Sequence, residues 1–267
     1  MLTSYHNHST WSDGTASIRE MALAARDAGV TEFGISDHLV LAPFGKVSWS
    51  MPIDRFGEYV QEAQEVKREL ECPSFQFRVG VEADYFAETI GDLKGLLASQ
   101  PLDYVIGAVH YSGEFPIDES KKLWDALPDA AARHHVWDVY LDKLQGLCGA
   151  GCFDFVAHLD LPKKFGEFLP TDLESRMEEI LNEIAKTGLA VEINTAGLDK
   201  PCQEWYPAVN LLKRAVVLDI PLLVNADAHA TAQVVRHFPE ARSALRNLSV
   251  TKVSEFSNRH RKMILLD

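Results

Sequence analysis

The sequence predicts an α/β protein, a single (β/α)7 TIM-like barrel domain spanning residues 1–267. Two observations favour this fold. Short and almost continuously apolar segments alternate with amphipathic helical segments along the whole chain, which is the pattern of parallel strands joined by right-handed crossovers. There are seven such units, and strands that are apolar on both faces favour a closed or nearly closed barrel. A doubly wound open sheet is the alternative architecture.

The first four strands are expected where short apolar runs end in polar side chains. A short apolar start runs into His6-Asn7-His8, and in an extended strand these two imidazoles point to the same side. The next three apolar runs are Phe33–His38, Phe75–Tyr85 and Leu102–His110. Apolar residues at helical spacing predict the connecting helices over residues 17–28, 54–71 and 90–99, the first of them ended by a glycine at position 29.

The second half of the chain continues the same alternation. A predicted helix over residues 129–147 precedes a strand over 153–158, and a helix over 172–187 leads through Gly188 to a strand over 189–194. A helix over 207–218, with proline at its first position, leads to the seventh strand over 221–229. A helical tail is expected to close the chain.

Composition restricts the classes of function. The net charge of −13 does not favour long nucleic acid or an anionic membrane surface as a partner. We find no signal peptide and no apolar run near the roughly 18 residues of a membrane span, so a cytoplasmic protein is expected. The four cysteines have neither CxxC nor disulfide-framework spacing, which indicates small core residues in a reducing cytosol.

Polar side chains gather at the carboxyl ends of the predicted strands, where barrel enzymes carry their chemistry. Six of the ten histidines lie there, whereas a random distribution would place roughly one. A set of imidazoles and carboxylates is typical of transition-metal sites. The strand-end candidates are His6, His8, His38, Glu82, His110, His158, Asp227 and His229, and Asp13 follows the first strand. Strand six ends in Asn194 and Thr195, without an obvious ligand. The other histidines, at positions 134, 135, 237 and 260, are expected to be partly exposed polar residues.

This pattern resembles the polymerase and histidinol phosphatase (PHP) superfamily. The motifs that carry the resemblance are His6-x-His8, Asp13, Ser36-Asp37-His38, Glu82, Val109-His110, Ala157-His158 and Asp227-Ala228-His229. Within the superfamily, the chain looks most like the histidinol-phosphate phosphatases, through residues 158–164, residues 192–198 and Tyr206-Pro207. The resemblance implies a distorted (β/α)7 barrel and a trinuclear metal centre.

The resemblance also implies which residues bind which metal. His6, His8, Glu82 and Asp227 would hold one ion; Glu82, His110 and His158 would hold a second, with Glu82 bridging; Asp13, His38 and His229 would hold a third. Glu82, Asp227 and His229 are the expected catalytic residues. Two or three divalent transition-metal ions are expected, and the mixed ligands suit Zn, Mn or Fe.

The implied function is a metal-dependent phosphomonoesterase, a phosphoric monoester hydrolase of histidine biosynthesis. It would cleave L-histidinol phosphate to L-histidinol and phosphate, by attack of a metal-bound hydroxide on phosphorus. Lys200 and Lys163 are the predicted phosphate-binding residues. Histidinol phosphatases often carry an arginine just after Asn-Thr-x-Gly-Leu, and this chain has Asp199 and Lys200 there.

Other functions fit parts of the pattern. A PHP-type nucleotide phosphatase or 3′-end exonuclease shares the metal ligands, although the charge of −13 argues against a long polynucleotide. A non-catalytic PHP module that binds metal would not need a complete ligand set. A carbon–nitrogen hydrolase of the amidohydrolase type also begins with His-x-His, but it would usually carry a bridging lysine at a strand end, and these strand ends show none.

Overall fold

Parallel strands from the whole length of the chain form one curved sheet in the computed structural model, which describes residues 2–266. The eight-stranded sheet has the order β1-β2-β4-β5-β8-β9-β10. The short strand β3 lies off this path: β2 pairs with the first half of β4, and β3 pairs with its second half. Its strands are β1 (Thr3–Ser4), β2 (Glu32–Ile35), β3 (His38–Leu39), β4 (Gln76–Asp84), β5 (Tyr104–Ala108), β8 (Phe155–Val156), β9 (Ala190–Asn194) and β10 (Leu222–Asn225). A parallel bridge between Asn7 and Ala228 joins the two ends of the sheet. The predicted barrel is therefore confirmed as nearly closed.

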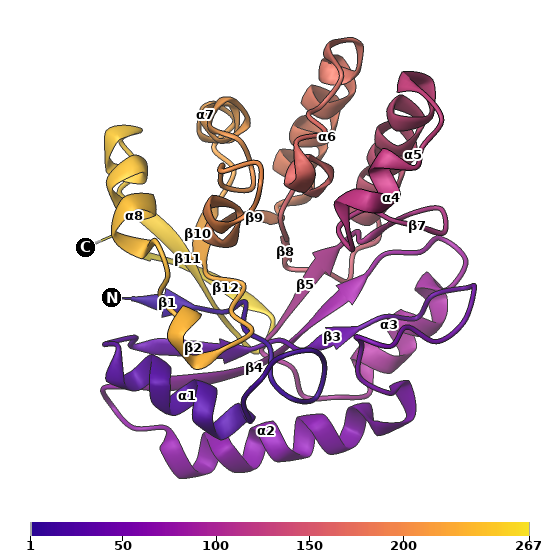
Figure 1. Ribbon diagram of the computed structural model, residues 1–267. Coiled ribbons are helices and arrows are strands. Elements are labelled where there is room, and N and C mark those ends of the chain that lie inside the picture. The colour runs from indigo at the N-terminus through magenta and orange to yellow at the C-terminus, as the bar shows by residue number, and fades with distance from the viewer. Residues whose placement is uncertain (1, 267) are drawn as a thin grey trace.

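The helices form an outer layer around the strands (Figure 1). They are α1 (Ile18–Asp27), α2 (Phe56–Leu70), α3 (Ile90–Ala98), α4 (Lys121–Asp125), α5 (Ala130–Gly149), α6 (Glu174–Thr187), α7 (Val209–Val217) and α8 (Phe238–Asn247). Helix α1 begins as its sequence predicts, because Ser17 and Glu20 cap each other's backbone N–H groups in a capping box. The predicted helices of the barrel are present within a few residues of their expected bounds.

Alternate residues of each strand point into the barrel and fill it in two layers. The lower layer is a buried apolar cluster that includes Tyr5, Tyr104 and Phe155. The Tyr104 hydroxyl donates to the backbone oxygen of Ile35 (3.0 Å). A Cβ at Gly80 would lie 2.3 Å from the Tyr104 ring, so this strand position requires glycine. Two residues further along β4, at its carboxyl end, Glu82 begins the polar upper layer.

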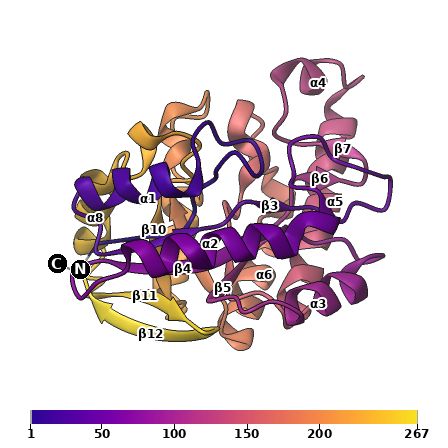
Figure 2. The same cartoon turned by 90° about the horizontal axis from the view of Figure 1, so that it is seen from below.

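The predicted helical tail is wrong beyond α8. The chain ends instead in an antiparallel hairpin of β11 (Lys252–Ser257) and β12 (His260–Leu265), which lies near both termini (Figure 2). Phe256 enters the lower layer of the barrel, and Arg78 donates to its carbonyl (Nε···O 3.0 Å). Arg259 also donates from Nε to Asp154 Oδ2, just before β8 (2.6 Å). The hairpin therefore closes the amino-terminal end of the barrel.

One further segment bears on function. After β5, a small hairpin of β6 (Tyr111–Ser112) and β7 (Phe115–Pro116) leads back toward the end of β5. Within residues 2–266, no helix has both the length and the apolar character needed to cross a bilayer. All four cysteines are free thiols; Cys148 and Cys202 are buried as expected of core residues, whereas Cys72 is exposed and Cys152 only partly buried.

Candidate metal centre

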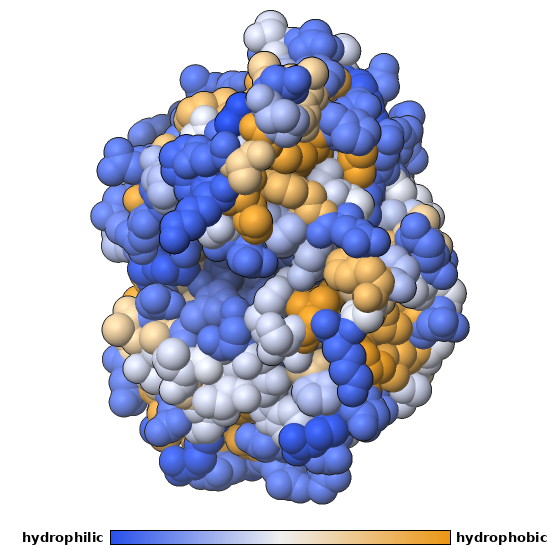
Figure 3. Space-filling view, turned by 45° about the vertical axis from the view of Figure 1, so that its right-hand side comes forward, coloured by the Kyte–Doolittle hydropathy of each residue, from blue (hydrophilic) through white to orange (hydrophobic). Residues whose placement is uncertain are grey.

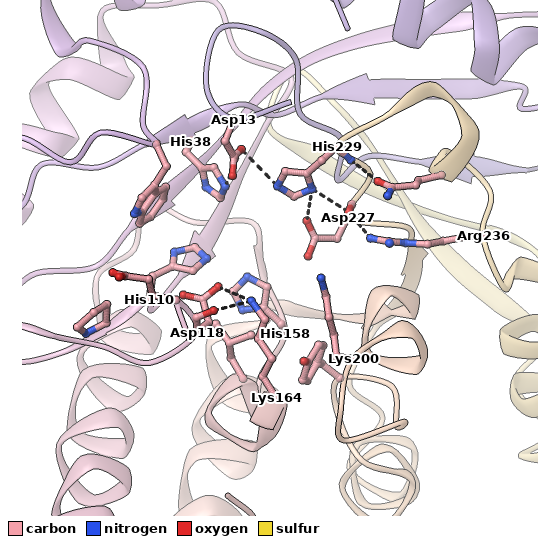
Figure 4. Close-up of a pocket in the computed structure, with 16 residues that line it drawn as sticks. Asp13, His38, His110, Asp118, His158, Lys164, Lys200, Asp227, His229 and Arg236 are labelled. Atoms are coloured by element: carbon pink, nitrogen blue, oxygen red, sulfur yellow. Dashed lines mark hydrogen bonds and ion pairs between the residues drawn. The ribbon is translucent and has the colours of Figure 1, made fainter. Parts of the chain in front are cut away.

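A cavity of about 360 Å³ opens at the carboxyl ends of the barrel strands. In Figure 3, one face of the molecule is hollowed, and hydrophilic side chains surround the hollow. Figure 4 shows how the side chains of the cavity converge from different strand ends. The cavity is lined by Asp13, His38, Trp49, His110, Pro116, Asp118, Glu119, His158, Leu161, Lys164, Lys200, Tyr206, Asp227, His229, Gln233 and Arg236.

Glu82 lies at the centre of the cluster and is fully buried. Its Oε1 is 2.9 Å from His158 Nε2 and 3.6 Å from His110 Nε2. Its Oε2 is 3.3 Å from His6 Nε2 and 2.7 Å from His38 Nδ1. Oε2 also lies 3.7 Å from His8 Nε2. Each carboxylate oxygen thus faces a different set of imidazoles, which is the arrangement that a bridging ligand needs.

The remaining carboxylates extend the cluster toward the cavity mouth. Asp227 Oδ1 lies 3.3 Å from His8 Nε2 and 3.6 Å from His6 Nε2. Asp13 Oδ1 lies 3.3 Å from His229 Nε2 and 3.5 Å from His38 Nε2. The ligand atoms that could share an ion form the groups His6–His8–Asp227, His6–Glu82–His158, His38–Glu82–His110 and His8–Asp13–His38–His229. All nine predicted ligands therefore come together, and His8 faces the outer group as well as the inner one.

Buried carboxylates behind the cluster orient two of the imidazoles. His6 Nδ1 donates to Glu192 (3.0 Å to Oε2), which also accepts from Asn194 and Asn225. His110 Nδ1 donates to Asp84 Oδ1 (2.6 Å). In both rings the Nε2 atom is left to face Glu82, and such partners fix the tautomer of a metal-ligating histidine. Strand β9, the sixth strand of the prediction, thus contributes Glu192 as a support for His6 rather than as a ligand.

The backbone that carries the candidate ligands is held by buried hydrogen bonds and includes two unusual conformations. Asp37 accepts from the backbone N–H of Ser9 (2.7 Å) and the hydroxyl of Ser12 (2.6 Å), and so holds the loop that carries Asp13. His158 and Asp227 both have positive φ, 26° and 50°. This conformation is costly for residues other than glycine and is concentrated at functional sites.

The cluster fits divalent cations because several buried donor atoms make no hydrogen bond of good geometry within the protein. Among residues 2–266, these atoms include His6 Nε2, both ring nitrogens of His8 and His158 Nδ1. His38 Nδ1 and Glu82 Oε2 make none either, although they lie 2.7 Å apart. Buried polar atoms are nearly always paired, so a concentration of unpaired ones needs a ligand. Burial, together with the nearby His38 and His229, lowers the pKa of His8 to about 3. His8 is therefore a neutral imidazole with one ring-nitrogen lone pair available for a metal.

The charge of Glu82 is also preserved. Burial alone would raise its pKa, but the surrounding imidazoles, His6 and His38 foremost, outweigh burial and hold the pKa of Glu82 well below its usual range. The same balance, with His6 as the first of the opposing groups, holds the pKa of Asp227 below its usual range. The two buried carboxylates therefore remain anionic, as metal ligands must.

Comparison with known proteins agrees with this geometry. The sequence profile of the PHP domain matches residues 4–196, which is most of the chain. The chain belongs to the PHP family. A protein of Deinococcus radiodurans described as a probable histidinol-phosphatase is 34% identical over 255 residues, which is 93% of each chain.

Two further comparisons give lower sequence identity. The crystal structure of the histidinol phosphate phosphatase of Lactococcus lactis, in complex with zinc, L-histidinol and phosphate, matches 98% of both chains with a TM-score of 0.83 at 21% identity. The DNA polymerase/3′-5′ exonuclease PolX of Bacillus subtilis is 26% identical over 224 residues, but the match covers only 33% of that protein.

The two lysines predicted to bind phosphate in this PHP protein have different surroundings. Lys200 lines the cavity, as expected. Lys163 does not: its ammonium is buried against Asp160 (2.9 Å) and Glu204 (3.0 Å), and it donates to a backbone carbonyl behind the cavity wall. Because both partners are carboxylates, Lys163 balances buried charge and is not free to contact a substrate. Its predicted role is therefore wrong, and the neighbouring Lys164 lines the cavity instead.

Other side chains that sequence reasoning overlooked also line the cavity: Trp49, Asp118 and Arg236. All three lie in loops, where no periodic pattern announces them. The histidines expected to be outside the site are outside it. His134 pairs with Asp172 on the surface, and His237 pairs with Asp199 (2.7 Å) beside the cavity.

Proposed function

We propose that this PHP protein is a metal-dependent phosphomonoesterase that hydrolyses L-histidinol phosphate to L-histidinol and phosphate. The observation that carries the proposal is a single cavity that contains both the metal-ligand cluster and three cationic side chains, Lys164, Lys200 and Arg236. Metal ligands beside cationic side chains suit a phosphate ester. The choice of alcohol is supported by the full-length similarity to a probable histidinol-phosphatase.

Two or three divalent ions, Zn, Mn or Fe, would be held by the nine clustered side chains. Glu82 would bridge, with the His6–His8–Asp227 group, the His110–His158 pair and the Asp13–His38–His229 group around it. When bound, such ions supply Lewis-acid chemistry that activates water, neutralises the phosphate and stabilises the leaving alkoxide.

The proposed catalytic residues are Glu82, Asp227 and His229. Glu82 is inaccessible and acts by fixing the ligand geometry. The side chains of Asp227 and His229 are 18% and 32% exposed, so both can reach a phosphoester that enters the cavity. His229 Nε2 lies 3.3 Å from Asp13, and its Nδ1 donates to the Asp227 carbonyl (3.1 Å), which holds its ring toward the cavity.

The phosphate group would bind between Lys200 and Arg236. Among residues 2–266, no acceptor lies within hydrogen-bond distance of the half-buried Lys200 ammonium. Burial, together with the nearby Lys164, lowers the pKa of Lys200, and an anion would relieve both effects. Arg236 is anchored by donation to the Ala226 carbonyl (2.8 Å) and pairs with Asp199 (3.4 Å). The arginine missing after Asn-Thr-x-Gly-Leu thus has a substitute from another loop.

Lys200→Ala is expected to lower kcat/KM for phosphomonoesters about tenfold to hundredfold. The reason is the loss of a charge-assisted hydrogen bond of roughly 1.5–3 kcal/mol. The loss should be similar for every ester, because the contact is to phosphate and not to the alcohol. Lys186→Ala, on the outer surface of α6 and 72% exposed, is the control and should change nothing. A loss of kcat/KM restricted to esters of one alcohol would show that Lys200 contacts the alcohol and not the phosphate.

The metal requirement can be tested directly. Protein stripped with a chelator should release no phosphate from L-histidinol phosphate, and activity should return on addition of Zn, Mn or Fe. Metal analysis of the active form should find two or three ions per chain. Full activity of the stripped protein would contradict metal-dependent hydrolysis, and a single ion in the fully active enzyme would contradict the multinuclear centre.

A nucleotide phosphatase or 3′-end exonuclease is the second candidate, supported by the match to PolX over 84% of this chain. The net charge of −13 provides no electrostatic attraction for a polynucleotide. We also propose a cytoplasmic location, supported by the four free thiols, which suit a reducing compartment.

A further inference from the structure

The two sides of the cavity differ in charge. Lys200 and Arg236 lie on the side of Asp227, as Figure 4 shows. On the opposite side, around His110, the cavity is lined by an aromatic ring, Trp49, and by two carboxylates, Asp118 and Glu119. If phosphate binds at the metals and the two cations, the rest of the substrate faces the aromatic and acidic side.

Trp49 forms a fixed wall on this side. Its indole packs edge-to-face on two metal-ligand rings, 4.6 Å from His38 and 5.1 Å from His110 between centroids. It also lies parallel to the ring of Tyr111 (6.1 Å, 9°). Ser50 anchors the loop behind it, accepting from Val40 N–H (3.0 Å) and donating to the His38 carbonyl (3.1 Å). The indole is therefore held rigidly beside the reacting centre.

Asp118 approaches the same histidine from the other side. The β6–β7 hairpin returns the chain to the end of β5, where Ile117 N–H donates to the His110 carbonyl (3.0 Å). Asp118 Oδ2 pairs with Lys164 (3.1 Å), and the side chain is 28% exposed. In the part of the chain that the structure describes, no group donates a hydrogen bond to Asp118 Oδ1. One carboxylate oxygen thus remains available to a cation in the cavity.

We propose that Asp118 and Trp49 form the subsite for the non-phosphate end of the substrate. Asp118 binds an ammonium group, and Trp49 packs against a planar heterocycle. This proposal rests on the proposed function, because L-histidinol phosphate carries an ammonium one carbon away from its phosphoester carbon and an imidazole beyond it. The nearby Glu119 adds negative charge, which favours a cationic substrate over a nucleotide.

The experiment compares two substrates that differ only in the ammonium: L-histidinol phosphate and its deamino analogue, 3-(imidazol-4-yl)propyl phosphate. Wild-type enzyme should prefer the ammonium substrate by about 10- to 100-fold in kcat/KM, since a site built for a polar group discriminates against its absence. Asp118→Asn should reduce this preference to less than about threefold, mainly through the loss on L-histidinol phosphate. Glu114→Gln, which removes one charge at the exposed turn of the same hairpin, should retain the wild-type preference.

The contribution of the ring is tested with Trp49→Leu. Wild-type enzyme should favour 3-(imidazol-4-yl)propyl phosphate over propyl phosphate, and Trp49→Leu should lose most of that preference. An unchanged ammonium preference in Asp118→Asn, or an equal loss on both substrates, would overturn the subsite, and so would an unchanged ring preference in Trp49→Leu. A wild-type enzyme that does not hydrolyse L-histidinol phosphate at all would instead contradict the proposed function.

Discussion

Glu82→Gln is expected to lower phosphatase activity by roughly a thousandfold or more. Bound metal ions stabilise the transition state by several kcal/mol, and that stabilisation depends on an intact metal centre. The substitution preserves size but removes the negative charge that lies among five imidazoles. Two cations a few ångströms apart repel each other strongly in a buried site, and the bridging charge offsets that repulsion. We therefore expect fewer metal ions per chain, measured together with kcat/KM on L-histidinol phosphate.

Glu88→Gln is the matched control, since it removes the same charge from an exposed position just beyond the same strand. It should retain wild-type activity and metal content. The far-ultraviolet circular dichroism of Glu82→Gln should remain that of the wild type, because the apolar layer below is untouched. Wild-type turnover by fully metallated Glu82→Gln would show that Glu82 is not the bridging ligand.

Phe256→Ala is expected to cost about 3–5 kcal/mol of unfolding free energy, the usual range for truncating a buried phenylalanine. Its ring is 2% exposed and packs against Tyr5 (6.0 Å) and Phe155 (5.4 Å) inside the barrel. For a chain of this size, such a loss lowers the melting temperature by on the order of 10 °C. Thermal unfolding of chelator-treated protein measures the effect without a contribution from bound metal.

Leu265→Ala provides the comparison within the same hairpin, because Leu265 is 66% exposed. Its effect should stay within about 0.5 kcal/mol. If the two variants unfold at the same temperature, the hairpin does not close the barrel in solution.

The barrel and the positions of its candidate ligands could be predicted from sequence because each depends on a local pattern. Apolar runs mark the buried parallel strands, and each ligand follows its strand at the end where a barrel places its chemistry. Glu82 and His110 are examples: the strands β4 and β5 fix where both residues lie. The supporting role of Glu192 could have been found by the same rule, since a buried strand rarely contains an unpaired carboxylate.

The errors lie where no periodic pattern applies. Lys163 and Lys164 are neighbours in a short 3₁₀ turn. Lys163 pairs with Asp160 of the same turn and with the distant Glu204, while Lys164 faces the cavity, and helical periodicity does not decide between these directions. Trp49 and Arg236 are placed by loops whose path depends on distant contacts. The terminal hairpin had only a weak sequence signal. Its tight turn places Asn258 and Arg259 at positive φ, and of these two residue types only asparagine commonly adopts that conformation.

The central claim is tested most directly by the ratio of specificity constants for L-histidinol phosphate and a panel of nucleoside monophosphates and bisphosphates, measured with metal-reconstituted enzyme. A cavity with cations on one side and an aromatic, acidic wall on the other predicts that L-histidinol phosphate is the better substrate. A nucleotide preferred by more than about tenfold, a gap near 1.4 kcal/mol, would contradict the histidinol assignment.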